Sequence, residues 1–223
     1  MIETVRVIGA GRVGSAVSAR LRERGLTLGE SVADAELVVL CVPDRAIPEA
    51  AAGVPPGPWV AHVSGATALA ALEPHRRRFS VHPLQTFTLA RGPEQLDGAW
   101  AAVTAETQEA AAAGFWLAET LGLRPFPLRD DARPLYHAGA AMAANYLVAL
   151  RRAAGRLLEE AGAPPEALDA LMLRTIENGF ELTGPIARGD WETVERHRAA
   201  IRAAAPELEP MYDALAEVTA ACV

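Results

Sequence analysis

The stretch Gly9-Ala10-Gly11-Arg12-Val13-Gly14 constrains this chain most, because it matches the pattern GxGxxG between two regular segments. A β-branched run over residues 4–9 leads into it, and residues 12–24 repeat apolar positions at helical spacing. In such a strand–turn–helix unit, the first glycine makes the turn, the second admits a pyrophosphate and the third allows close packing. Free amides at the helix start, aided by the helix dipole, bind the phosphates. The motif predicts a dinucleotide site that includes Arg12 and Val13; the alternative is a sharp turn without a ligand.

The residues before about 130 alternate between strand and helix patterns. Further strands are expected at residues 36–42, 59–63, 79–82, 99–104 and 123–127, with a helix at 107–121. This alternation predicts an α/β fold of the Rossmann type, with a doubly wound, mostly parallel sheet in a domain of residues 1–129.

After about residue 130 the strand patterns stop. Helical patterns cover residues 131–161, 165–181, 190–204 and 207–221. Gly162 and the two prolines after Ala163 supply a stop between the first two. We therefore expect a smaller, all-α C-terminal domain of residues 130–223.

Composition excludes several classes of protein. No apolar run approaches the ~20 residues that span a bilayer, and the first residues lack the basic segment of a signal peptide, so a cytoplasmic protein is expected. A net charge of −7 argues against nucleic-acid binding. The two cysteines, Cys41 and Cys222, form no cluster that predicts a disulfide or a metal site. All 21 basic residues are arginine, so no lysine can act as acid, base or Schiff-base former.

The adenosine end of the expected dinucleotide site is shortened. A typical fingerprint has a second strand and an acidic residue about 20 residues past the glycines, where the acid holds the ribose. Residues 25–31 leave room for only a very short strand, and Glu30 falls near the expected position. Glu30 is either that acid or a solvated loop residue, whereas Arg12 could face a 2′-phosphate. The sequence leaves both NADP and NAD open.

Val42-Pro43 and Ser64-Gly65, taken with the glycine turn, give the N-terminal half a resemblance to known reductases. It resembles pyrroline-5-carboxylate reductases, ketopantoate reductases and 6-phosphogluconate-dehydrogenase-like enzymes. The segments 82–87 (HPLQTF) and 182–190 (LTGPIARGD) are similar to signatures of an uncharacterised bacterial family of NADP-dependent oxidoreductases. In that family a Rossmann domain precedes a C-terminal helical domain of unknown function, which is similar to the C-terminal domain of 6-phosphogluconate dehydrogenase.

The resemblance implies a bound NADP, with NAD as the alternative, across the carboxyl ends of the strands. The pyrophosphate would rest on residues 11–14, the middle of the cofactor would pass Val42 and Pro43, and the nicotinamide would approach Ser64 and Gly65. The resemblance also implies that the helical domain closes over the nicotinamide and forms a homodimer.

His82 is the first candidate for chemistry, because it falls at a strand end on the edge where such sheets bind ligands. An imidazole there can give a proton to a carbonyl or imine as hydride arrives. The alternative is that His82 and Pro83 only shape a turn.

His137 and Asn145 lie eight residues apart on the first expected helix of the C-terminal domain and can face one cleft. Related hydroxyacid dehydrogenases carry a catalytic lysine four residues before an asparagine, and this chain has Ala141 at that position. His137 is the nearest replacement as proton donor, and Asn145 would orient the substrate. Otherwise His137 only bonds to the backbone at the helix start.

Arg188 lies in a constrained loop, where its guanidinium can grip a substrate carboxylate or pair across a subunit interface. Together these residues predict an NAD(P)H-dependent oxidoreductase that reduces a small carbonyl or imine substrate, which can bear a carboxylate. The rival interpretation is a non-catalytic dinucleotide-binding sensor or scaffold.

Overall fold

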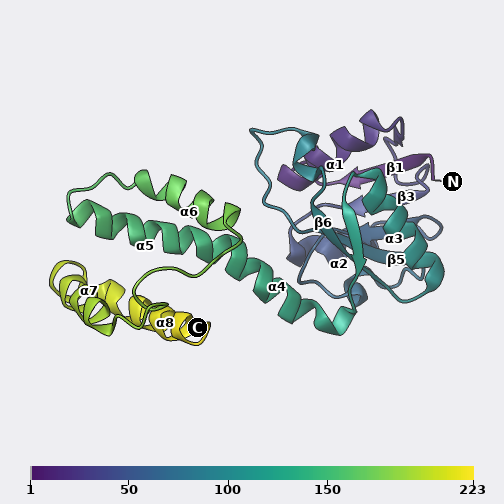
Figure 1. Ribbon diagram of the computed structural model, residues 1–223. Coiled ribbons are helices and arrows are strands. Elements are labelled where there is room, and N and C mark those ends of the chain that lie inside the picture. The colour runs from purple at the N-terminus through teal and green to yellow at the C-terminus, as the bar shows by residue number, and fades with distance from the viewer. Residues whose placement is uncertain (1) are drawn as a thin grey trace. The chain divides into compact units, whose positions relative to one another are not determined.

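The computed structural model describes residues 2–223 and divides the chain into two compact units (Figure 1). The first unit ends at Ala141, and the second runs from Met142 to Val223. Among the described residues, no helix is both long and apolar enough to cross a membrane.

The first unit is built on one sheet with strand order β2-β1-β3-β4-β5-β6-β7 within the described residues. Its strands are β1 (Thr4–Ile8), β2 (Thr27–Leu28), β3 (Leu37–Leu40), β4 (Trp59–His62), β5 (Arg78–Pro83), β6 (Trp100–Ala105) and β7 (Arg124–Pro127). Its helices are α1 (Arg12–Glu23), α2 (Ile47–Ala52), α3 (Gln108–Thr120) and α4 (Arg133–Ala141), with short 3-10 turns η1 (Asp44–Ala46), η2 (Leu69–Leu72), η3 (Pro93–Leu96) and η4 (Asp130–Ala132). This architecture confirms the α/β, Rossmann-like class.

Alternating side chains of the strands fill a core on each face of the sheet. On one face, Val5, Leu37, Val39 and Phe79 pack with Val17 and Leu21 of α1 and Leu117 of α3. On the other face, Val38, Leu40 and Val60 pack with Ile47 of α2 and with Leu69 and Leu72 of η2. Because β3 is buried on both sides, it has the continuous apolar run typical of a central parallel strand.

Strand β6 pairs antiparallel with β5, whereas the other neighbouring strands pair in parallel. A parallel return needs a crossover segment, usually a helix, across the face of the sheet. The connection over residues 84–99 contains only the short turn η3. The missing crossover helix explains why this pair departs from the parallel pattern.

The second unit is helical throughout its regular structure. It contains the π-helical segment η5 (Met142–Tyr146), α5 (Leu147–Glu160), α6 (Ala167–Glu177), α7 (Trp191–Ala204), the 3-10 turn η6 (Pro206–Leu208) and α8 (Glu209–Ala220). The pattern over residues 131–161 predicts one helix, and the structure divides it into η4, α4, η5 and α5. Asp190 caps α7, because its Oδ1 accepts a hydrogen bond from Thr193 N at 3.1 Å.

The division between the units falls after α4, later than the boundary at 129 and 130 that the end of the strand pattern suggests. Arg133 gives the physical reason. This first residue of α4 is buried and bonds to Ser64 in the loop after β4 and to Ser80 of β5, so α4 packs as part of the first unit.

Candidate functional site

The glycine turn has the shape that a pyrophosphate site requires. Gly9 has φ +110°, and a Cβ there would lie 2.3 Å from the Cys41 carbonyl oxygen. A Cβ on Gly14 would lie 1.9 Å from the Gly9 oxygen. At Gly11, by contrast, no described atom lies within 4 Å of the position that a Cβ would take. Gly11 caps α1 without any side-chain bond from the described residues, so the first amides of the helix stay available for an anion.

The second strand is as short as expected, and a cavity of about 490 Å³ opens beside β1 and the glycine turn. Two arginines, Arg6 and Arg22, line it together with the hydroxyls of Ser15 and Ser18. Arg6 Nη1 donates to the Gly29 oxygen at 3.0 Å, and neither arginine forms an ion pair with another described residue. This cavity therefore offers positive charge next to the phosphate-binding turn.

The carboxyl ends of β1, β3, β4 and β5 share one edge of the sheet, because these strands are parallel. This edge brings three predicted site residues together. His82 lies near the end of β5 and has its ring centre 6.3 Å from that of His137 on α4. Gly65 lies between them: a Cβ there would be 2.7 Å from His82 Cε1 and 2.9 Å from His137 Cδ2. Only a glycine leaves room for both imidazoles at this point.

Tyr136 completes this cluster, although no sequence motif predicts its role. His82 Nδ1 and the Tyr136 hydroxyl oxygen are 2.8 Å apart, and the two rings meet edge to face at 87°. The only sequence signal is its place directly before His137. The pairing joins residues 54 positions apart, so it depends on how α4 packs on the sheet.

Burial shifts the pKa of each partner further toward its neutral form. Burial lowers the pKa of His82 to about 4, and the nearby charges of His137 and Arg133 act in the same direction, while Asp44 opposes them. Burial raises the pKa of Tyr136 to about 12, with Arg133 opposing. The site thus presents an uncharged imidazole bonded to an uncharged phenol.

Arg133 begins the helix α4 that carries Tyr136 and His137, and its side chain is only 1% exposed. Its Nη1 donates to the backbone carbonyl oxygen of Ser64 at 2.9 Å, and its Nη2 donates to the Ser80 hydroxyl. Its Nε forms an ion pair with Asp130 at 2.8 Å. Asp130 in turn accepts a bond from Leu69 N at 3.1 Å. The guanidinium therefore fixes the loop after β4, strand β5 and the start of α4 in one arrangement. The sequence pattern does not predict this role either.

The hydroxyl of Ser64 shapes the loop that carries Gly65. It accepts bonds from the backbone amides of Ala66 and Thr67 at 3.2 and 3.0 Å and lies 2.9 Å from the Thr67 hydroxyl. The Ser64 amide donates to Nδ1 of the buried His62 at 3.2 Å. Burial, with Arg133 and His82 nearby, lowers the pKa of His62 to about 3, so this ring is a neutral structural acceptor.

The other predicted site residues are more exposed or belong to the second unit. Val42 and Pro43 follow β3 on the edge that carries the glycine turn. Arg12 and Glu30 are exposed. Asn145 is exposed in η5, and Arg188 is exposed in the segment between α6 and α7. These two therefore stay predictions.

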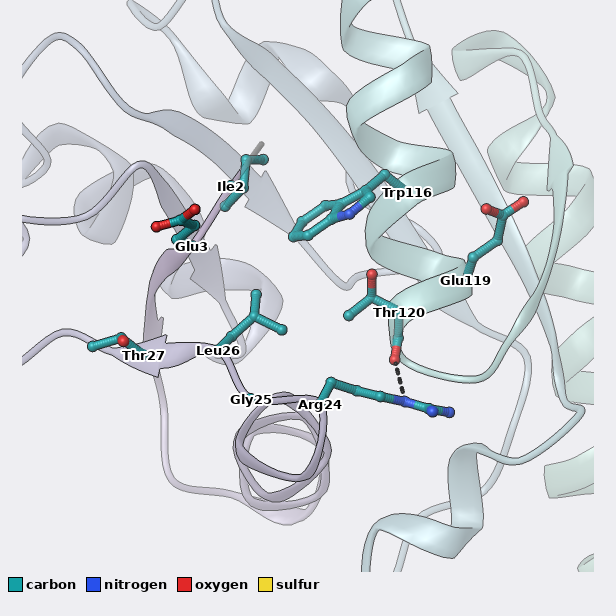
Figure 2. Close-up of a pocket in the computed structure, with 9 residues that line it drawn as sticks. All are labelled: Ile2, Glu3, Arg24, Gly25, Leu26, Thr27, Trp116, Glu119 and Thr120. Carbon is teal, nitrogen blue, oxygen red and sulfur yellow. Dashed lines mark hydrogen bonds between the residues drawn. The ribbon is translucent and has the colours of Figure 1, made fainter.

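A larger cavity, of about 700 Å³, lies at the opposite edge of the sheet (Figure 2). It is lined by residues before β1 and around the last turns of α1 and α3, and Figure 2 shows the side chains of Ile2, Leu26 and Trp116 converging on it. Arg24 Nε donates to the Thr120 oxygen at 3.2 Å at its border. None of the predicted site residues lines this cavity, so its size does not make it the reaction site.

Comparison with protein families decides where the chain belongs. The model of a domain of unknown function, DUF2520, matches residues 99–219, which is more than half of the chain. The chain belongs to the DUF2520 family. A Rossmann-like domain model matches residues 22–86. The DUF2520 match begins next to β6, so the family region takes in the end of the first unit, including Tyr136 and His137, as well as the second unit.

Solved structures show the same fold at low sequence identity. Protein BF3122 from Bacteroides fragilis, named provisionally as an NADP oxidoreductase, has a TM-score of 0.79 and 19% identity, with 98% of each chain covered. Protein TM1727 from Thermotoga maritima has a TM-score of 0.78 and 20% identity, again with 98% of each chain covered. A reductive aminase from Aspergillus terreus, in complex with NADPH and ethyl levulinate, has a TM-score of 0.70 and 17% identity over 97% of this chain and 93% of its own.

A search of the curated proteins found no match to this sequence.

Proposed function

We propose that this member of the DUF2520 family is an NAD(P)H-dependent reductase of a small carbonyl or imine substrate. One observation supports the proposal most: His82 and His137 flank Gly65, and Tyr136 contacts His82, on the sheet edge that also carries the glycine turn. Hydrogen-bond donors at the carboxyl edge of a Rossmann sheet are placed where ligands of this fold bind. The reductive aminase with the same fold is bound to NADPH, which agrees with this class of reaction.

The cofactor proposed for this site is NADP, with NAD as the alternative. The amides after Gly11 would hold the pyrophosphate, Val42 and Pro43 would flank the middle of the cofactor, and the loop of Ser64 and Gly65 would face the nicotinamide. Bound there, the reduced nicotinamide supplies a hydride. Exposed Arg12, with Arg6 and Arg22 in the adjoining cavity, favours NADP, because its 2′-phosphate is an anion that guanidinium groups bind well.

The chain's own residues must supply the proton that completes the reduction. We assign His82 the hydrogen bond to the carbonyl oxygen or imine nitrogen, because its half-buried, neutral ring can donate without carrying charge. His137 lies beside it and is exposed to solvent, so it is the proposed proton source. Asn145 and Arg188 are proposed to orient the substrate, Arg188 through a carboxylate.

A homodimer is proposed for the second unit because its helices expose many large apolar side chains. They include Val148 of α5, Leu171, Leu173 and Ile176 of α6, Phe180 after α6, and Val218 of α8. Phe180 is 70% exposed and Val218 is 65% exposed. An apolar surface of this kind marks an association site, and a second copy of the chain is the occupant that the family resemblance implies.

The first test is a titration of the purified protein with NADPH and separately with NADH, following energy transfer from its four tryptophans to the nicotinamide. Saturable binding of either cofactor supports the reductase and justifies a screen of carbonyl and imine substrates. If neither cofactor binds to the folded protein, the reductase proposal fails.

The second candidate is a dinucleotide-binding sensor or scaffold without catalysis. The two-residue β2 and the absence of lysine from the chain favour it. Tight binding of a cofactor with no turnover of any carbonyl or imine in the screen would support this candidate instead.

A further inference from the structure

We propose that Tyr136 is a positioning residue that holds His82 as the tautomer with its proton on Nε2. A neutral imidazole has one N–H donor and one acceptor nitrogen, so the partner of one nitrogen decides where the proton lies. The catalytic meaning of this tautomer rests on the proposed function, whereas the tautomer itself is a property of the protein alone.

A hydrogen bond joins the two side chains. The Tyr136 oxygen lies 2.8 Å from His82 Nδ1, and no other described residue offers an acceptor to this hydroxyl. In this proposal the phenol donates to Nδ1, so Nδ1 is the unprotonated nitrogen. The proton of the ring is then on Nε2. The pKa of His82 is lowered and that of Tyr136 is raised, so both groups are neutral near pH 7 and this assignment applies under ordinary conditions.

Tyr136 is held in place by contacts other than its hydrogen bond to His82. Its ring packs edge to face on Phe126 of β7, with ring centres 6.0 Å apart. It follows Arg133 by three residues on α4, and the buried bonds of Arg133 fix the start of that helix. The phenol is thus a preorganised donor whose position does not depend on a ligand.

Nε2 of His82 faces the loop where the nicotinamide is proposed to lie. It is 2.8 Å from the position that a Cβ on Gly65 would occupy. An N–H at this point can stabilise negative charge that develops on a carbonyl oxygen during reduction. In the opposite tautomer a lone pair would face that oxygen and repel it. Tyr136 therefore decides whether His82 assists or opposes the reaction.

The charged and titratable groups around His82 come from several elements. Asp44 follows β3, His62 ends β4, and Arg133, Tyr136 and His137 belong to α4. Arg133 and His137 disfavour a proton on the ring, whereas Asp44 favours one. Because burial and the charge of Arg133 act in the same direction, a second proton on His82 is disfavoured, and the ring stays neutral with one proton to place.

The second unit contains a matched pair for comparison. His197 Nδ1 lies 2.9 Å from the Tyr212 hydroxyl, and these rings also meet at 87°. His197 is exposed on α7 and lies outside the predicted site. Tyr212→Phe therefore removes the same kind of bond elsewhere in the chain.

The test is nuclear magnetic resonance of the protein labelled with ¹⁵N-histidine, without cofactor or substrate. Long-range proton–nitrogen correlations distinguish the two tautomers of each of the five histidines, and His82→Gln identifies the His82 signals. We expect wild-type His82 to be the Nε2–H tautomer, Tyr136→Phe to convert it to a mixture, and Tyr212→Phe to leave it unchanged. An Nδ1–H tautomer in the wild type overturns the proposal, as does an unchanged His82 in Tyr136→Phe.

The wild-type spectrum alone distinguishes the two tautomers of His82, even if Tyr136→Phe does not fold. Once a substrate is known, Tyr136→Phe should lower kcat by roughly tenfold with little change in the KM for the cofactor. Failure of cofactor binding with the expected tautomer would reject the proposed function alone. Cofactor binding with the wrong tautomer would reject the positioning role alone.

Discussion

The guanidinium of Arg133 donates a hydrogen bond to the carbonyl oxygen of Ser64, 69 residues earlier in the chain, at 2.9 Å. Through this bond the start of α4 and the loop that carries Gly65 keep a fixed separation. Residues on α4 can therefore face the carboxyl edge of the sheet in a defined geometry. Because this bond is buried, Arg133 stabilises the folded protein and also positions the residues of the site.

Replacing Arg133 with methionine should destabilise the protein by about 3–5 kcal/mol, because Asp130, Ser64 and Ser80 would lose a buried partner. Urea denaturation measures this change. Arg129→Met is the matched control, since Arg129 pairs with Asp131 but its side chain is 83% exposed, and it should cost less than about 1 kcal/mol. Equal losses for both variants would contradict the buried role of Arg133.

Gly65→Ala should disturb the site, because its methyl group would fall within 3 Å of both imidazoles. We expect a loss of about 1–3 kcal/mol in the free energy of unfolding, together with reduced turnover. The control is Gly139→Ala in α4, where a Cβ meets no described atom within 4 Å. That variant should gain up to about 1 kcal/mol, because alanine favours a helix. If Gly65→Ala behaves like Gly139→Ala, the rings do not pack as described.

Stability should fall as the pH drops below about 6.5. The folded pKa values of His62 and His82, about 3 and about 4, lie below the ordinary value of 6.5. Between these limits the unfolded chain binds more protons than the folded one, so acid favours unfolding. Each histidine contributes a slope of about 1.4 kcal/mol per pH unit within its window.

Urea denaturation from pH 7 to pH 4 measures this slope, and His62→Asn should reduce it. A free energy of unfolding that stays constant over that range would show that neither ring is buried in the neutral form.

Gly11→Asp should weaken binding of NADPH by at least about tenfold, because a carboxylate would face the pyrophosphate. The open space at Gly11 lets the protein keep its fold. Gly11→Asn has nearly the same size without the charge, and it should bind better than the aspartate variant in the tryptophan energy-transfer assay. Unchanged binding by Gly11→Asp would place the phosphates elsewhere.

Leu173→Glu should convert a homodimer to a monomer, because Leu173 is 60% exposed among the apolar side chains of α6. Light scattering coupled to size-exclusion chromatography measures the mass. Leu89→Glu in the first unit, at a side chain that is 71% exposed, should leave the mass unchanged. A wild-type protein that is monomeric at high concentration would reject the dimer.

The sequence predicts the features that depend on local patterns. The glycine turn, the short second strand, the α/β class and the helical C-terminal region all follow from motifs or periodicity within short windows. His82 follows from its place at a strand end, and Gly65 follows from the resemblance to known reductases. The structure brings them together with His137, as the parallel order of the strands allows.

Arg133 and Tyr136 could not be predicted in the same way, because their partners lie 69 and 54 residues away. An arginine after two aspartates looks like an exposed helix start in the sequence, and only the packing of α4 buries it. The antiparallel β6 also depends on the absence of a helix across the face of the sheet. Predicting these features requires knowing how the strands and α4 pack in three dimensions.

The outer strand β7 has a consequence for aggregation. Arg124 N and Leu128 N donate inward, to the oxygen of Ala99 just before β6 and to that of Val103 in β6. The N–H positions of residues 125 and 127 therefore point to the free side of the strand. Both positions are prolines, which have no N–H to offer a strand from another molecule. At the other border, β2 is only two residues long. Both borders of the sheet thus resist strand pairing with another molecule. The protein can therefore expose the apolar side chains of its helices without aggregating through its sheet.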